Sequence, residues 1–175
     1  KLPGEAQVVA MVAEMMRAPV AILMQVPEQP LFGGMVEDEI ISHTFAEYMK
    51  SGDAEWPLLL PMVKSAARAM DAVQEFAKIE WQYDLEHFLV TGASKRGWTT
   101  WLTSAVDPRV NALAPMVIDM LNMRAHMDLQ KLSFGGYSEQ IQDYTDKGLQ
   151  EHQAAGQCRG EGRIRRWRSL HRKGH

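Results

Sequence analysis

The chain has 175 residues, about the length of one domain, and its 46% hydrophobic and 23% charged residues exclude a disordered chain, a collagen-like repeat and a disulfide-stapled miniprotein. A single cysteine, Cys158, excludes an internal disulfide and a multi-cysteine metal site, and no apolar run reaches the ~20 residues of a membrane span. The net charge of −3 argues against nucleic acid as a partner.

The charge divides the chain into two parts. Residues 151–175 hold seven basic and two acidic residues, a balance of +5, so residues 1–150 carry −8. A basic arm that binds an acidic partner fits this composition. An out-of-frame or misassembled end fits it as well, because the apolar residues of this glycine- and arginine-rich segment show little period. We expect residues 151–175 to form an extended tail that packs against nothing.

The first half of the chain predicts two helices and a strand. Apolar residues at helical spacing predict a helix over 4–17, and the continuous apolar run 19–26 predicts a strand buried in a parallel sheet. After a proline- and glycine-rich loop, Glu37, Asp38 and Glu39 open a second helix that ends near Gly52. Acids at a helix N-terminus interact with the helix dipole. A metal site built on these three acids is the alternative.

The second half alternates helices with short apolar runs. A wide apolar stripe predicts a helix over 60–78, HFLVTG predicts a buried strand over 87–92, and a further helix closes near Asp107. Residues 110–118 predict a third strand, although they include Pro115. Strands separated by helices indicate a parallel sheet, so the expected fold class is α/β, with central parallel strands flanked by helices.

The segment GASKRG, residues 92–97, has the composition of a nucleophile elbow. Such an elbow places a serine on a strained strand-to-helix turn, and Gly92 and Gly97 supply the small neighbours that let the backbone bend. Ser94 is then exposed at the carboxyl end of a central strand, where α/β sheets bind their ligands. The N–H of Lys95, at the start of the next helix, is placed to donate to an oxyanion.

Two other interpretations of this segment stay open. Arg96 departs from the strict G-x-S-x-G pattern, and a turn containing glycine and serine also forms where nothing reacts. Glycine, serine, lysine and arginine at a helix N-terminus also suit a phosphate, although the GxxxxGK[ST] spacing is absent.

The sequence resembles a known family most closely in the stretch GASKRGWTTW. Similar segments are 25–32, 37–45, 61–76, 91–110, 114–123 and, more loosely, 133–149. They resemble the PhoPQ-activated pathogenicity-related protein family. The resemblance implies a partial α/β-hydrolase fold, with residues 1–150 as the central portion of the domain and Ser94 as the nucleophile. The chain is then a fragment that lacks flanking strands.

The partners of the serine are harder to place. In α/β-hydrolases an acid and then a histidine follow the serine, and the resemblance puts both beyond residue 150. The chain therefore lacks a clear triad acid and base. Asp119, at the end of the last predicted strand, is the internal candidate for the acid, with the capping of a turn as its alternative role. His126, a short segment later, is the internal candidate for the base.

The expected function is hydrolysis of a small-molecule ester or of a peptide or amide, with this chain as an incomplete, inactive fragment. The alternative is a non-catalytic secreted or surface interaction protein that retains the α/β-hydrolase fold. No metal and no organic cofactor is implied. The sequence leaves the oligomeric state and the location open. Export to the periplasm or the medium fits both alternatives, and no signal peptide is present in this chain.

Overall fold

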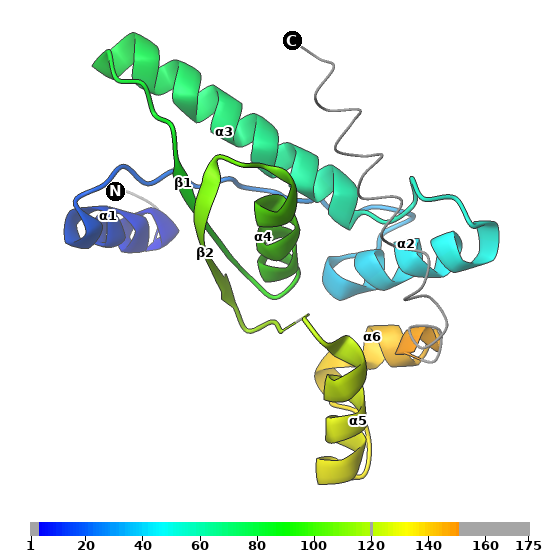
Figure 1. Ribbon diagram of the computed structural model, residues 1–175. Helices are drawn as coiled ribbons and strands as arrows, with labels where there is room; N and C mark the ends of the chain where they lie inside the picture. Colours follow the sequence, from blue (N-terminus) through cyan, green and yellow to red (C-terminus); the bar gives the residue numbers. More distant parts are fainter. Residues whose placement is uncertain (1–3, 120, 151–175) are drawn as a thin grey trace.

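The computed structural model describes residues 4–119 and 121–150, so both interpretations of the tail lie outside the described residues. The helices are α1 (Gly4–Met16), α2 (Glu37–Ser51), α3 (Leu59–Trp81), α4 (Lys95–Val106), α5 (Met123–Phe134) and α6 (Gln142–Thr145), with a 3-10 turn at Glu139–Ile141. The strands are β1 (Phe88–Ala93) and β2 (Val110–Met116). Figure 1 shows their arrangement.

The two strands are parallel neighbours joined through α4. Register runs from Leu89 opposite Ala112 to Ala93 opposite Met116. Helix α4 packs against both strands and against the long helix α3 (Figure 1). The predicted mixture of helices and strands with parallel pairing is therefore confirmed, with two paired strands in the described residues.

The strand predicted over 19–26 is wrong. The segment is extended but pairs with neither β1 nor β2 in the described part of the chain. Its apolar side chains are exposed, for example Leu23 at 47% and Met24 at 57%. An apolar run becomes a buried strand only where a neighbouring strand and a packing layer receive it, and the described residues provide neither at this position.

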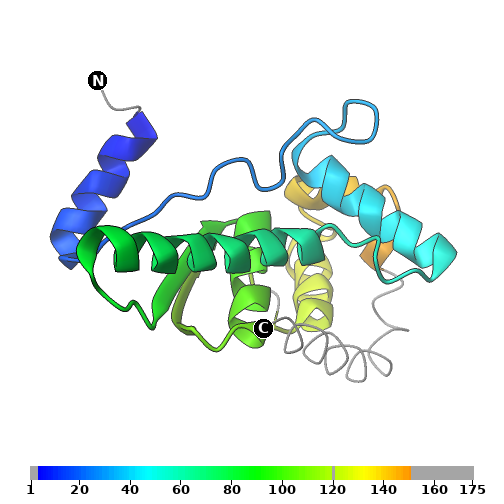
Figure 2. The same cartoon turned by 90° about the horizontal axis from the view of Figure 1, so that it is seen from above.

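The core sits where α2, α3 and α4 meet. Ile41, Leu59 and Met62 form a fully buried cluster, and Phe45 stacks on Trp98 at its edge with ring centroids 5.3 Å apart. Figure 2 shows α3 running across the molecule, with α2 near the end where α3 begins. The core therefore fastens the start of α4 to the two preceding helices.

Large apolar surfaces lie away from this core. Side chains on α1 and α5 face solvent, with Met15 at 76%, Leu132 at 85% and Phe134 at 85% exposure. None of the described helices combines the length and the apolarity needed to cross a bilayer.

Candidate functional site

Ser94 occupies the turn between β1 and α4, as the sequence predicts. Its backbone has φ 53° and ψ −124°, a conformation that residues with a Cβ rarely adopt. The Ser94 N–H donates to the carbonyl of Met116 at 3.0 Å, and the Ser94 carbonyl accepts the N–H of Trp98 at 2.9 Å. These bonds tie the strained turn to β2 on one side and to α4 on the other. The side chain is half-buried rather than fully exposed.

The positions of Gly92 and Gly97, on either side of Ser94, leave no room for a side chain. A Cβ on Gly92 would lie 2.7 Å from the carbonyl oxygen of Arg96, a backbone atom. A Cβ on Gly97 would collide with the Ile118 side chain and approach the carbonyls of Gly92 and Met116 to 3.0 Å. The turn is therefore as tight as the glycine spacing predicts, because α4 starts directly against the ends of β1 and β2.

The first turn of α4 leaves backbone donors free beside Ser94. Among the described residues no acceptor takes the N–H of Lys95, and no side chain caps the helix. The first N–H groups of a helix have no partner within the helix and carry its positive dipole. The Lys95 N–H is thus available beside Ser94, and its donation to an oxyanion stays a prediction.

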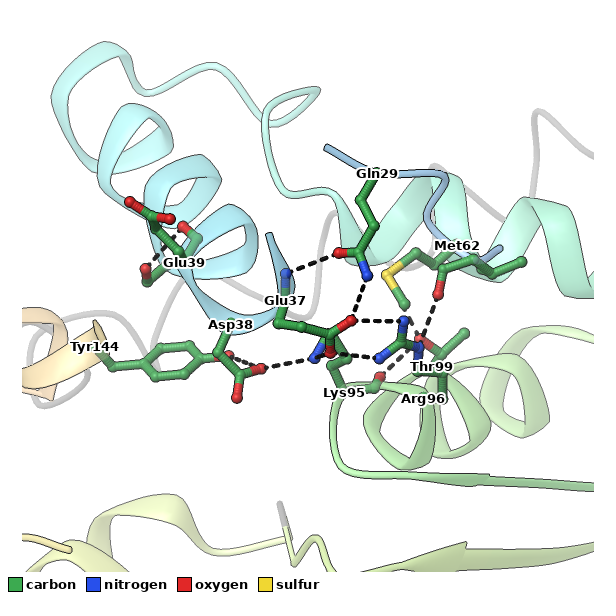
Figure 3. Close-up of polar contacts among 11 residues, drawn as sticks. Gln29, Glu37, Asp38, Glu39, Met62, Lys95, Arg96, Thr99 and Tyr144 are labelled. Carbon is green, nitrogen blue, oxygen red and sulfur yellow. Dashed lines mark hydrogen bonds and ion pairs between the residues drawn. The ribbon is translucent and has the colours of Figure 1, made fainter. Parts of the chain in front are cut away.

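The side chains of Lys95 and Arg96 are already paired with acids. The Lys95 side chain is 3% exposed and forms ion pairs with Glu37 and, at 3.3 Å, with Asp38 (Figure 3). The guanidinium of Arg96 binds Glu37 at 2.9 Å. Both cations are already paired with carboxylates, which weighs against the alternative of a phosphate site at this turn.

The acids at the start of α2 do more than face the helix dipole. Arg96 and Lys95 donate hydrogen bonds that lower the pKa of Glu37 to about 2. Burial and the neighbouring Asp38 raise the pKa of the Tyr144 hydroxyl. The pairing of these acids with Lys95 and Arg96 was not predicted from the sequence. No group of three or more potential metal-ligating side chains occurs in the described residues, so the metal alternative has no support.

Asp119 and His126 lie together beyond β2. The Nε2 atom of His126 is 2.9 Å from Oδ2 of Asp119, and both side chains are partly exposed, at 38% and 60%. The other oxygen of Asp119 accepts the N–H of Leu121 at 3.2 Å, which is the turn-capping role expected as the alternative. The two candidates thus contact each other. Within the described residues neither forms a hydrogen bond with Ser94.

A shallow hollow of about 260 Å³ lies apart from the Ser94 turn. It is lined by Phe32, Asp53, Glu55, Trp56, Leu58 and Pro61. Ser94 is not among the residues that line this hollow, so the hollow is not a substrate pocket for the Ser94 turn.

Comparisons with known proteins place the chain in a family. It is 39% identical over 136 residues to autocrine proliferation repressor protein A of Dictyostelium discoideum, an alignment that covers 74% of this chain and 27% of that protein. The chain therefore spans about a quarter of the length of this relative. No solved structure matches it. The family model described as PhoPQ-activated pathogenicity-related protein matches residues 1–160. The chain belongs to the PhoPQ-activated pathogenicity-related protein family.

Proposed function

We propose that this chain carries the nucleophile turn of a serine hydrolase of the α/β-hydrolase type, acting on a small ester or on a peptide or amide. The observation that carries the proposal is the backbone of Ser94, held at φ 53° and ψ −124° between a parallel strand and a helix. Strain of this kind at a polar residue is typical of functional sites. The free Lys95 N–H beside it supports the same reading.

The chemistry follows from this arrangement. The Ser94 Oγ attacks the carbonyl carbon while a histidine takes its proton, and the carbonyl oxygen becomes an oxyanion that the Lys95 N–H stabilises. The intermediate collapses, and the alcohol or amine leaves with the proton returned by the histidine. Water then hydrolyses the acyl-serine by the same two steps. The reaction needs neither a metal nor an organic cofactor.

No histidine of the described residues is hydrogen-bonded to Ser94 as its general base. The Ser94 hydroxyl has no hydrogen-bond partner among the described residues, and His126 uses Nε2 to bind Asp119. We therefore expect the base and acid to come from sequence outside this chain, and the 175-residue chain alone to hydrolyse small esters negligibly. His126 and Asp119 remain the internal candidates.

A second candidate is a non-catalytic secreted or surface interaction protein. The relative is named an autocrine proliferation repressor, a name that describes an effect on proliferation and no chemical reaction. In this alternative the strained turn is a retained feature of the fold, and Ser94 is dispensable. The two candidates differ in what removal of the Ser94 hydroxyl does.

The test is hydrolysis of p-nitrophenyl esters and peptide anilides by the complete gene product. Ser94→Ala should lower kcat by about 10³-fold or more, because catalysis by a nucleophile and its base is lost as a unit. Ser133→Ala, at an exposed serine of α5, is the matched control and should change nothing. An unchanged kcat in Ser94→Ala would contradict Ser94 as the nucleophile. No hydrolysis of any substrate would contradict the enzyme and support the interaction protein. His126→Ala then separates an internal base from an external one.

A further inference from the structure

The two residues that follow Ser94 are anchored by a single carboxylate from another helix. Glu37, the first residue of α2, pairs with the Lys95 ammonium and with the Arg96 guanidinium, the latter at 2.9 Å (Figure 3). Arg96 also donates from Nε to the carbonyl of Val26 at 3.0 Å. Helix α4 is thus fastened at its first turn, directly next to the proposed nucleophile, to the start of α2 and to the segment that precedes it.

Glu37 is itself held on both sides. The Gln29 side chain donates to Oε1 of Glu37 and accepts the Glu37 N–H at 2.8 Å. The next residue, Asp38, approaches the Lys95 ammonium at 3.3 Å and accepts a long hydrogen bond of 3.5 Å from the Tyr144 hydroxyl. The carboxylate therefore has a fixed place, which a freely moving surface acid would lack.

The burial of Lys95 makes this anchor specific. Its side chain is 3% exposed, and a buried ammonium is strongly unfavourable without a paired acid. If Glu37 loses its charge, Lys95 keeps only Asp38, at 3.3 Å, as a paired acid and Arg96 loses its carboxylate, which loosens the hold of these two side chains on the Lys95 peptide. That peptide carries the N–H that the proposed mechanism assigns to the oxyanion. Small errors in the direction of such a donor are costly to the reaction rate.

We propose that Glu37 is a positioning residue for the Ser94 turn, acting through Lys95 and Arg96 to hold the Lys95 N–H in the direction of the developing oxyanion. The proposal rests on the function proposed above and deepens it. It predicts that the charge of Glu37 matters, since the size of the side chain is kept by glutamine. It also predicts that the effect falls on the chemical step, because the Glu37 carboxylate is engaged with Lys95 and Arg96.

The chain supplies a matched control in Glu39. It lies two residues further along the same first turn of α2 and is exposed, and its carboxylate has no partner among the described residues. In Figure 3 it points away from Lys95 and Arg96. Replacing it by glutamine removes the same charge from the same helix end and leaves the anchor intact.

The kinetic experiment uses the complete gene product and p-nitrophenyl butyrate, with active sites counted by a fluorophosphonate. Glu37→Gln should lower kcat per active site by about 10- to 100-fold with KM changed less than about twofold. Glu37→Asp keeps the charge and should recover part of the loss, and Glu39→Gln should match the wild type. The double variant of Glu37→Gln with Lys95→Met should lose no more than the larger single loss, because the two residues act together.

A second measurement is independent of activity. Amide hydrogen exchange of residues 94–98 should be about tenfold faster in Glu37→Gln than in wild type, and unchanged in Glu39→Gln. Hydrolysis that depends on Ser94 but is equal in Glu37→Gln and wild type would overturn the positioning role, and so would equal losses in Glu37→Gln and Glu39→Gln. If no hydrolysis depends on Ser94, the proposed function fails, and unchanged exchange at residues 94–98 would overturn the anchor as well.

Discussion

Replacing Ser94 by glycine should stabilise the protein. The backbone at φ 53° and ψ −124° costs a residue with a Cβ about 1–3 kcal/mol, and glycine adopts it freely. Glycine also loses roughly 0.5–1 kcal/mol of additional conformational entropy on folding, which opposes the gain. The difference is a net stabilisation of about 1 kcal/mol, or about 2–4 °C in Tm for a chain of this size.

Ser94→Ala is the control for this change. Alanine removes the same hydroxyl, which has no hydrogen-bond partner among the described residues, but it keeps the Cβ and therefore the strain. Urea unfolding followed by circular dichroism gives the free energy of unfolding of each variant. A Ser94→Gly variant no more stable than Ser94→Ala would show that the turn stores no strain, and the main structural support for a nucleophile would be lost.

Three further predictions concern the folded chain. Gly92→Ala should lower the free energy of unfolding, measured by urea titration, by about 2 kcal/mol, because the new Cβ would lie 2.7 Å from a backbone oxygen of α4. Gly136→Ala is the control, and it should cost less than about 0.5 kcal/mol because the space around Gly136 is open. The pKa of Glu37 lies at about 2, below its ordinary 4.5, so the stabilising effect of the Glu37 carboxylate is complete above about pH 4.5 and is lost as the pH falls toward 2. The difference in unfolding free energy between wild type and Glu37→Gln should therefore shrink as the pH falls through this window. A difference that does not vary with pH would contradict the lowered pKa. Met62→Ala, at a side chain 1% exposed, should cost about 2–4 kcal/mol, and Leu132→Ala, at one 85% exposed, less than about 0.5 kcal/mol; equal Tm shifts would show that the core is misplaced.

The Ser94 turn could be predicted from sequence because its determinants are local. An apolar run that ends in Gly92, a serine two residues later and Gly97 at the start of an apolar helix define a strand, a tight turn and a helix within a few residues. The structure confirms each of these elements and shows why both glycines are needed. The strands β1 and β2 could also be predicted, because two apolar runs separated by a helix are typical of parallel neighbouring strands.

Other features of the fold and of the site could not be predicted because they depend on contacts between segments that are distant in the sequence. The run 19–26 has the composition of a buried strand, but composition does not specify which strand receives it. The anchor of the Ser94 turn joins residues 57 positions apart, Asp38 and Lys95, so no short motif contains it. A usable signal was present in the sequence: an acidic first turn on one helix and two adjacent cations at the start of another are complementary in charge. The contact between Asp119 and His126 arises because only a short segment separates them after β2.

The most direct test of Ser94 as a nucleophile is to locate its covalent adduct. The complete gene product is treated with a fluorophosphonate, which phosphonylates a serine that is activated by a base, and is then digested with trypsin and analysed by mass spectrometry. Cleavage after Lys78 and Lys95 gives the peptide 79–95, which contains Ser94 as its one serine. We predict a single phosphonyl group on Ser94 in the wild type and none on this peptide in Ser94→Ala. An unmodified peptide 79–95 from the wild-type protein, or labelling of another serine alone, would contradict the assignment of Ser94 as the nucleophile.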